Sequence, residues 1–175
     1  MKENIILAVW ILFVIFTVGS AIAETKNIQF SLVLSEEETK TTLHKPYSFM
    51  AHKDEKPKDI FVSEEVLLSR DDIESMSVIK KEDSPSKYYP AIDIVFKKKG
   101  SDKLLAISRH HLRKNLAIIV GDQVLSTPYI LYPLKKGHVL VSTWKIDTND
   151  AAEKFIRDLG FASTLKDSGQ RNGIR

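Results

Sequence analysis

The chain has 175 residues, of which 43% are apolar and 28% charged, with a formal net charge of +3. This composition is typical of a globular domain, and the length predicts one compact domain with a short appendage. The charge is too small to indicate nucleic-acid binding by itself. The sequence contains no cysteine, which excludes disulfides, thiol catalysis and thiolate metal sites.

Residues 1–23 predict a secretory signal peptide. Lys2 precedes an apolar run at residues 5–18, and Ala21-Ile22-Ala23 has the small residues of a cleavage site. Residues 5–23 carry no charge and are nearly long enough to span a bilayer of roughly 30 Å, so an uncleaved membrane anchor is the alternative. Either interpretation places the folded part outside the cytoplasmic membrane. We expect an exported, periplasmic protein, which contacts the membrane only if residues 5–23 stay attached.

Residues 24–58 are expected to form an N-terminal strand and a polar linker. Apolar and polar residues alternate at the start of 28–34, which predicts the strand. Residues 35–58 are polar and charged with two prolines, which predicts a loop with room for one helical turn.

Residues 59–162 are expected to form the folded domain. Residues 60–62 predict a short strand, and a short helix is predicted at about 70–77. Ser69 fits the N-cap of that helix, because Asp72 follows three residues later as in an acidic capping box.

The second half of the domain predicts strands at residues 91–96 and 138–143 and a helix at about 101–114, where leucines recur near helical spacing. Between them, LAIIVGDQVLS at 116–126 predicts a β-hairpin. Gly121 stands first in its two-residue turn, which suits a type II′ turn because glycine accepts a positive φ.

A final helix is predicted at 148–159, with Asp147 as its N-cap and Gly160 ending it at the C′ position. Residues 163–175 contain few apolar side chains and are expected to form a flexible tail. Strands, hairpins and helices alternate in this order, which predicts an α+β fold with a mixed or antiparallel sheet covered on one face by two helices.

The ordered set of these elements resembles the head subdomain of the large periplasmic domain of SecD and SecDF. The resemblance covers about 28–161. Its second half rests on one series of positions: Ile94-Val95-Phe96, Gly100, Leu116–Val120, Val124-Leu125-Ser126, Pro128, Gly137, Asp147, Asp150-Ala151 and Phe155. Upstream, residues 60–76 resemble the lead-in of the family and residues 28–38 the first strand of its periplasmic region. It departs from the family at the hairpin, where Gly-Asp replaces Asp-Gly, and after the last strand, where Trp144 and Lys145 replace a glycine.

The resemblance implies a ferredoxin-like arrangement and a role in contacting emerging unfolded protein. The SecD motor also has transmembrane helices with an acidic residue inside the membrane. The sequence shows no second apolar segment after residue 23, so we expect a head-like module without the proton-driven motor.

The sequence does not indicate an enzyme or a cofactor. His110 and His111 are adjacent on a predicted helix and point about 100° apart, so they cannot jointly hold a metal ion. Ser126 lacks the G-x-S-x-G pattern of an activated nucleophile, and no glycine-rich phosphate loop is present. We expect a non-catalytic protein with no cofactor and no metal.

Aromatic residues gather in the predicted loops and strand ends, together with proline and lysine, which favours contact with extended polypeptide. Ordinary packing is the alternative explanation. The predicted contact surface comprises Tyr88, Tyr89, Tyr129, Tyr132 and Trp144.

Two functions are therefore compared. The first is an exported module that binds polypeptide or an envelope component, accessory to protein export. The second is a structural or regulatory periplasmic protein that reuses the fold without a role in translocation.

Overall fold

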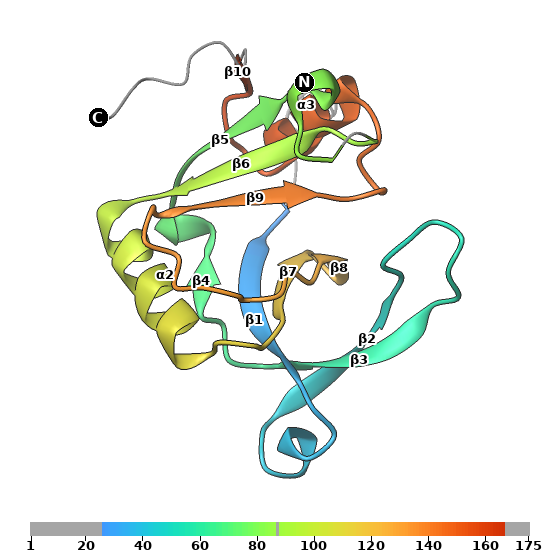
Figure 1. The fold of residues 1–175 in the computed structure, drawn as a ribbon, viewed down its shortest axis with the longest axis vertical. Helices are drawn as coiled ribbons and strands as arrows, with labels where there is room; N and C mark the ends of the chain where they lie inside the picture. Colours follow the sequence, from blue (N-terminus) through green and yellow to red (C-terminus); the bar gives the residue numbers. More distant parts are fainter. Residues whose placement is uncertain (1–25, 87, 167–175) are drawn as a thin grey trace, which may run out of the picture.

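The computed structural model describes residues 26–86 and 88–166, so the predicted signal peptide lies outside the described residues. The predicted α+β class is confirmed, with α2 at Lys98–His110 and α3 at Asn149–Asp158. The strands divide between two sheets rather than forming one (Figure 1).

The first sheet has the order β2-β3-β1-β7-β8, with β4 beside β1, and its neighbouring strands are antiparallel. Its strands are β1 (Ile28–Leu34), β2 (His44–Phe49), β3 (Lys58–Ser63), β4 (Leu68–Ser69), β7 (Leu116–Val120) and β8 (Gln123–Ser126).

The second sheet has the order β10-β5-β6-β9, in which β10 is parallel to β5 and the other pairs are antiparallel. Its strands are β5 (Ile73–Ile79), β6 (Ala91–Phe96), β9 (His138–Ser142) and β10 (Thr164–Lys166). Helix α2 packs beside β4 and β6, and α3 packs against β5. Short 3₁₀ turns lie at Glu38–Lys40, Arg70–Asp72 and Lys81–Asp83.

Strand β1 contributes to two hydrophobic clusters because its side chains alternate between the faces of the sheet. Ile28, Phe30 and Leu32 are buried in the main core, with side chains of the second sheet and both helices. Val33 packs against a second, smaller cluster on the opposite face, formed by Phe49, Val62, Ala117, Ile119 and Val124. The hairpin of β2 and β3 contributes Phe49 and Val62 to this second cluster.

The prediction of a helix at 70–77 is wrong. Only Arg70–Asp72 form a 3₁₀ turn, and β5 begins at Ile73. The Asp72 carboxylate does accept the Ser69 N–H at 3.1 Å, as in a capping box. The next residues pair with β6 and bury Ile73 in the core, so tertiary pairing overrides the local helix signal.

Part of the predicted linker is also a strand. Residues 44–49 form β2, which pairs along its whole length with β3, while the helical turn lies at Glu38–Lys40. The sequence does not indicate this strand, because β2 lies at the edge of the sheet and its mostly exposed side chains include many polar ones. Pro46 is tolerated there. In an edge strand the proline nitrogen, which carries no hydrogen, can face solvent instead of the neighbouring strand.

The other predicted elements differ from the structure mainly at their ends. Helix α2 ends at His110, and Arg113 then adopts a positive φ of 65°. Thr148, rather than Asp147, caps α3: its hydroxyl accepts the Ala151 N–H at 3.2 Å. Gly160 follows α3 with φ 76°, as predicted.

The hairpin turn agrees with its prediction, whereas part of the predicted tail is a strand. Gly121 has φ 57° while Asp122 does not adopt a positive φ, as in the predicted type II′ turn. In the predicted tail, Thr164–Lys166 pair with β5; residues 167–175 lie outside the described residues.

Two glycines allow close packing at the start of α2. A Cβ on Gly100 would lie 2.5 Å from the Asp72 carbonyl oxygen, and one on Gly137 would lie 2.3 Å from the Ser101 hydroxyl oxygen. Both distances are shorter than non-bonded atoms tolerate. The first turn of α2 therefore contacts the backbone before β5 and the turn before β9 directly.

Replacing Gly100 with alanine is predicted to destabilise the protein by about 1–3 kcal/mol, because the added methyl group overlaps backbone. In an unobstructed helix the same change would stabilise by up to about 1 kcal/mol. Urea unfolding measures the difference, with Arg109→Ala on the exposed part of α2 as control. A G100A protein at least as stable as the wild type would contradict the close contact.

An ion pair fastens the connection between β1 and β2. Lys114 donates to the Glu38 carboxylate, which also accepts the Ser35 N–H and hydroxyl at 3.0 Å each. The hydrogen bond from Lys114 is the main cause that lowers the pKa of Glu38 from 4.5 to about 2, and the Ser35 bonds add to it. Because the folded pKa is lowered, this contact contributes stability above about pH 4.5 and loses it as the pH falls toward 2.

Replacing Lys114 with methionine is predicted to raise the pKa of Glu38 toward 4.5 and to reduce the loss of stability between pH 4.5 and 2. NMR titration of the Glu38 carboxyl carbon measures the first effect, and unfolding at several pH values the second. Lys98→Met removes an exposed pair with Asp102 and serves as control. An unchanged Glu38 titration would overturn the assignment.

Candidate functional site

The structure places the five predicted contact residues in three regions. Tyr88 and Tyr89 lie in the connection between β5 and β6, with ring centroids 6.3 Å apart. Tyr129 and Tyr132 lie in the connection between β8 and β9, and Trp144 follows β9. Of these, only Tyr129 and Tyr132 line a common groove.

Trp144 is fixed by the fold. Its indole N–H donates to the carbonyl oxygen of Met50 at 3.1 Å, and its side chain is partly buried. Met50 directly follows β2, so this bond joins the segment after β9 to the hairpin of β2 and β3.

The two tyrosines of the β8–β9 connection are presented by a short extension of the first sheet. The Leu116 N–H donates to Pro128 O and the Ile130 N–H donates to Lys114 O, both at 2.9 Å. Tyr129 lies between these bonds, opposite Asn115. The extended backbone buries Ile130 and turns Tyr129 outward, with 51% of its surface exposed.

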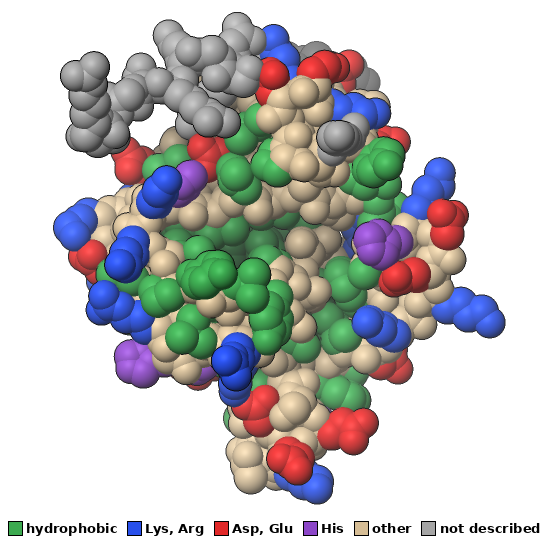
Figure 2. All heavy atoms as spheres, viewed as in Figure 1, with side chains coloured by type: hydrophobic (Ala, Val, Ile, Leu, Met, Phe, Trp, Pro, Cys, Tyr) green, Lys and Arg blue, Asp and Glu red, His purple; other side chains and the backbone are tan. Residues whose placement is uncertain are grey.

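A groove of about 260 Å³ lies between this segment and β9, and we call it the tyrosine groove. Its lining is almost wholly apolar: Leu116, Pro128, Tyr129, Ile130, Leu131, Tyr132, Leu134, His138, Val139 and Leu140. Figure 2 shows hydrophobic side chains on both sides of a hollow between β9 and the segment after β8.

Large apolar side chains of the tyrosine groove are open to solvent. Leu131 is 62% exposed, Tyr132 74% and Leu140 42%. Leu131 and Leu140 lie in the stretches 126–133 and 139–144 that the sequence favours for contact, but neither is among the five residues named from the sequence. The alternation along β9 predicts that Leu140 is exposed, because Val139 and Val141 on either side of it face the core.

His138 is the one ionisable side chain besides the two tyrosines in the lining of the tyrosine groove. Its Nδ1 lies 2.9 Å from Oδ1 of Asp93, which is only 8% exposed on the neighbouring strand β6. A buried carboxylate needs such a partner, because leaving it without hydrogen bonds would be costly. The pair therefore fixes the side chain of His138 in the lining of the groove.

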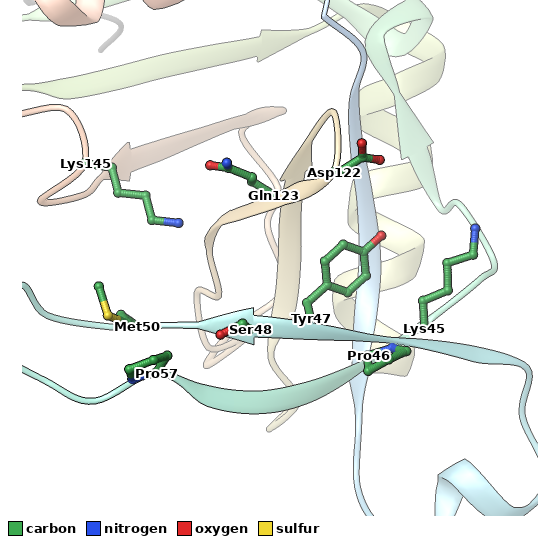
Figure 3. Close-up of a pocket in the computed structure, with 9 residues that line it drawn as sticks. All are labelled: Lys45, Pro46, Tyr47, Ser48, Met50, Pro57, Asp122, Gln123 and Lys145. Atoms are coloured by element: carbon green, nitrogen blue, oxygen red, sulfur yellow. The ribbon is translucent and has the colours of Figure 1, made fainter.

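Two further cavities lie on either side of the β7–β8 hairpin. The larger, of about 580 Å³, lies between that hairpin and β2, and Tyr47, Gln123 and Lys145 are directed toward it (Figure 3). The other, of about 450 Å³, is bounded by Lys26 and α3. Lysine and amide side chains make both more polar than the tyrosine groove.

Lys145 contacts both of these cavities. Its Nζ donates to the Val124 carbonyl oxygen at 2.8 Å, and burial lowers its pKa. No described carboxylate lies within ion-pair distance of this ammonium group. The bond to Val124 thus ties Lys145 to the edge strand β8.

The residues considered for catalysis are not brought together. No described histidine or carboxylate hydrogen-bonds the Ser126 hydroxyl, and His110 instead bonds Ala106 O at 2.8 Å. Burial is the main cause that lowers the pKa of His111, which lies at the end of α2. Within residues 26–86 and 88–166, no cluster of three histidines or acids is arranged to hold a metal ion.

The part of the chain that the structure describes has no helix of the length and apolar character needed to cross a membrane. The predicted N-terminal apolar segment lies outside that part.

Two solved SecDF structures have a similar fold. One, described as "Structure and function of a membrane component SecDF that enhances protein export", matches with a TM-score of 0.54 at 16% identity over 78% of this chain and 63% of that chain. The other, "Crystal structure of SecDF in Super-membrane-facing form", gives 0.53 at 16% identity over 80% of this chain and 19% of that chain. This chain thus spans less than two thirds of either structure.

No curated protein matches the sequence. The family described as "SecDF, P1 head subdomain" matches residues 47–154, which include β3 to β9 and the start of α3. This match covers more than half of the chain and agrees with the fold of the two solved structures, so the resemblance read from the sequence is confirmed: the chain belongs to the SecDF P1 head subdomain family.

Proposed function

We propose that this chain is an exported, non-catalytic module that binds unfolded polypeptide in the tyrosine groove and assists protein export. The observation that carries the proposal is the exposure of Tyr129, Leu131, Tyr132 and Leu140 around one apolar groove. A cluster of large exposed apolar side chains is unfavourable in water and marks an interaction surface.

The family and the chemistry of the groove both support an unfolded polypeptide as the partner. One of the similar structures is described as a membrane component that enhances protein export. Aromatic side chains with aliphatic neighbours offer a large contact area to many apolar sequences. An unfolded chain exposes such residues, whereas a folded protein buries most of them.

Tyr132 offers a direct test with a matched control, because Tyr132 and Tyr88 are both 74% exposed. Only Tyr132 lines the tyrosine groove. Tyr132→Ala is expected to reduce crosslinking to a permanently unfolded, exported substrate protein several-fold, while Tyr88→Ala leaves it unchanged. The yield of crosslinked substrate in cells is the measurement, and equal yields for both variants would count against the groove.

The place of action follows from the N-terminal sequence. We propose that residues 1–23 direct the chain across the cytoplasmic membrane and are removed, since Ala21 and Ala23 have the spacing of a cleavage site. Sequencing the N-terminus of the protein recovered from cells is expected to begin at Glu24. A start at Met1 would instead support the membrane anchor.

A further inference from the structure

The free edge of β9 forms one side of the tyrosine groove, and its backbone can be followed from the pairing with β6. The Phe96 N–H donates to Gly137 O at 2.9 Å, immediately before β9 begins. Bonded and non-bonded pairs alternate along an antiparallel ladder. His138 and Leu140, opposite Val95 and Asp93, therefore direct their own N–H and C=O groups away from β6.

These backbone groups are open on the groove side. No hydrogen bond from any other described segment reaches the backbone of His138 or Leu140. Unpaired groups along a strand edge form a template for another extended chain. Across the groove, Tyr129 likewise directs its backbone away from β7, because its neighbours Pro128 and Ile130 make the bonds to that side.

Two exposed lysines belong to the segment that lines the groove. Lys135 and Lys136 are exposed and stand between the groove residues Leu134 and His138. The field of these charges favours an occupant with acidic residues.

We infer that an extended polypeptide segment, apolar in its centre and flanked by acidic residues, binds by adding a strand to the free edge of β9. Its backbone pairs with His138 and Leu140, and its apolar side chains contact Tyr129, Leu131 and Tyr132. This inference rests on the proposed function and specifies how the polypeptide is held. Backbone pairing supplies affinity for any sequence that can extend, and the groove selects apolar side chains.

The test uses the purified full-length chain and a fluorescent ten-residue peptide in which valine and threonine alternate between two pairs of aspartates. Fluorescence anisotropy measures binding. The peptide is expected to bind, and a version with lysines in place of the aspartates is expected to bind about tenfold more weakly at low salt. Equal binding of the two peptides would overturn the charge preference.

Leu140 separates backbone pairing from side-chain contact. Leu140→Pro removes the outward N–H without breaking the ladder to β6, since proline is tolerated on a strand edge where its N–H would face solvent. Leu140→Ala keeps that N–H and removes only the side chain. Strand addition predicts that L140P weakens peptide binding about tenfold more than L140A. Equal affinities of the two variants would overturn it.

A modified peptide gives the same answer on the unmodified protein, should L140P not fold. N-methylation of every internal amide removes the donors of the peptide and keeps its side chains. This peptide is expected to bind at least about tenfold more weakly than its parent. Undiminished binding would show that side chains alone hold it.

The two proposals fail in distinguishable ways. If Tyr132→Ala abolishes substrate crosslinking but L140P and the N-methylated peptide bind normally, polypeptide binding stands and strand addition is wrong. If neither the peptide nor the unfolded substrate contacts the wild-type chain, the proposed function itself is wrong.

Discussion

Three consecutive side chains after β9 hold the free ends of the first sheet together. The Thr143 hydroxyl donates to Leu125 O at 3.3 Å, the Trp144 indole to Met50 O at 3.1 Å, and the Lys145 ammonium to Val124 O at 2.8 Å. Backbone groups at a sheet edge must find partners when they are removed from water. The segment 143–145 supplies these partners, so carbonyl groups at both edges of the sheet are bonded without another strand.

The arrangement of the two sheets depends on these three hydrogen bonds. Because β2 and β8 end the first sheet on opposite sides, bonds to Met50 and to the β8 carbonyls fix both ends relative to the second sheet. The smaller cluster of Phe49, Val62, Ala117, Ile119 and Val124 is thereby enclosed. The same segment leaves β9 at a fixed position, with one edge paired to β6 and the other beside the tyrosine groove.

The sequence predicted the buried strands better than the exposed ones. β1, β6 and β9 carry clear apolar patterns because one or both faces pack in the core. β2 reads as a linker, since its partner β3 and the Trp144 bond hold a strand whose own side chains are mostly polar and exposed. Ser69 and Asp72 made the local signal of a helix start, yet the chain extends after one turn because Ile73 belongs to the core.

The candidate site was predictable only in part for a related reason. Tyr129 and Tyr132 could be suspected as aromatics in a loop, but nothing local distinguishes them from Tyr88 and Tyr89. What joins them to a groove is the pairing of Pro128 and Ile130 with the start of β7, a long-range contact. Trp144 resembles a contact residue in sequence, whereas its indole is already bonded to Met50.

The His138–Asp93 pair bears on what the groove can recognise. Since Nδ1 of His138 is engaged with the buried Asp93 carboxylate, only Nε2 is left for other contacts. The polar side chain of the lining is thus used mainly to satisfy the sheet. Recognition is left to apolar contacts, to backbone groups and to the charge of the exposed Lys135 and Lys136, so it depends on the general character of a segment rather than on one exact sequence. The proposed binding of unfolded polypeptide fits a site of this kind, which suits many sequences of that character rather than one specific ligand.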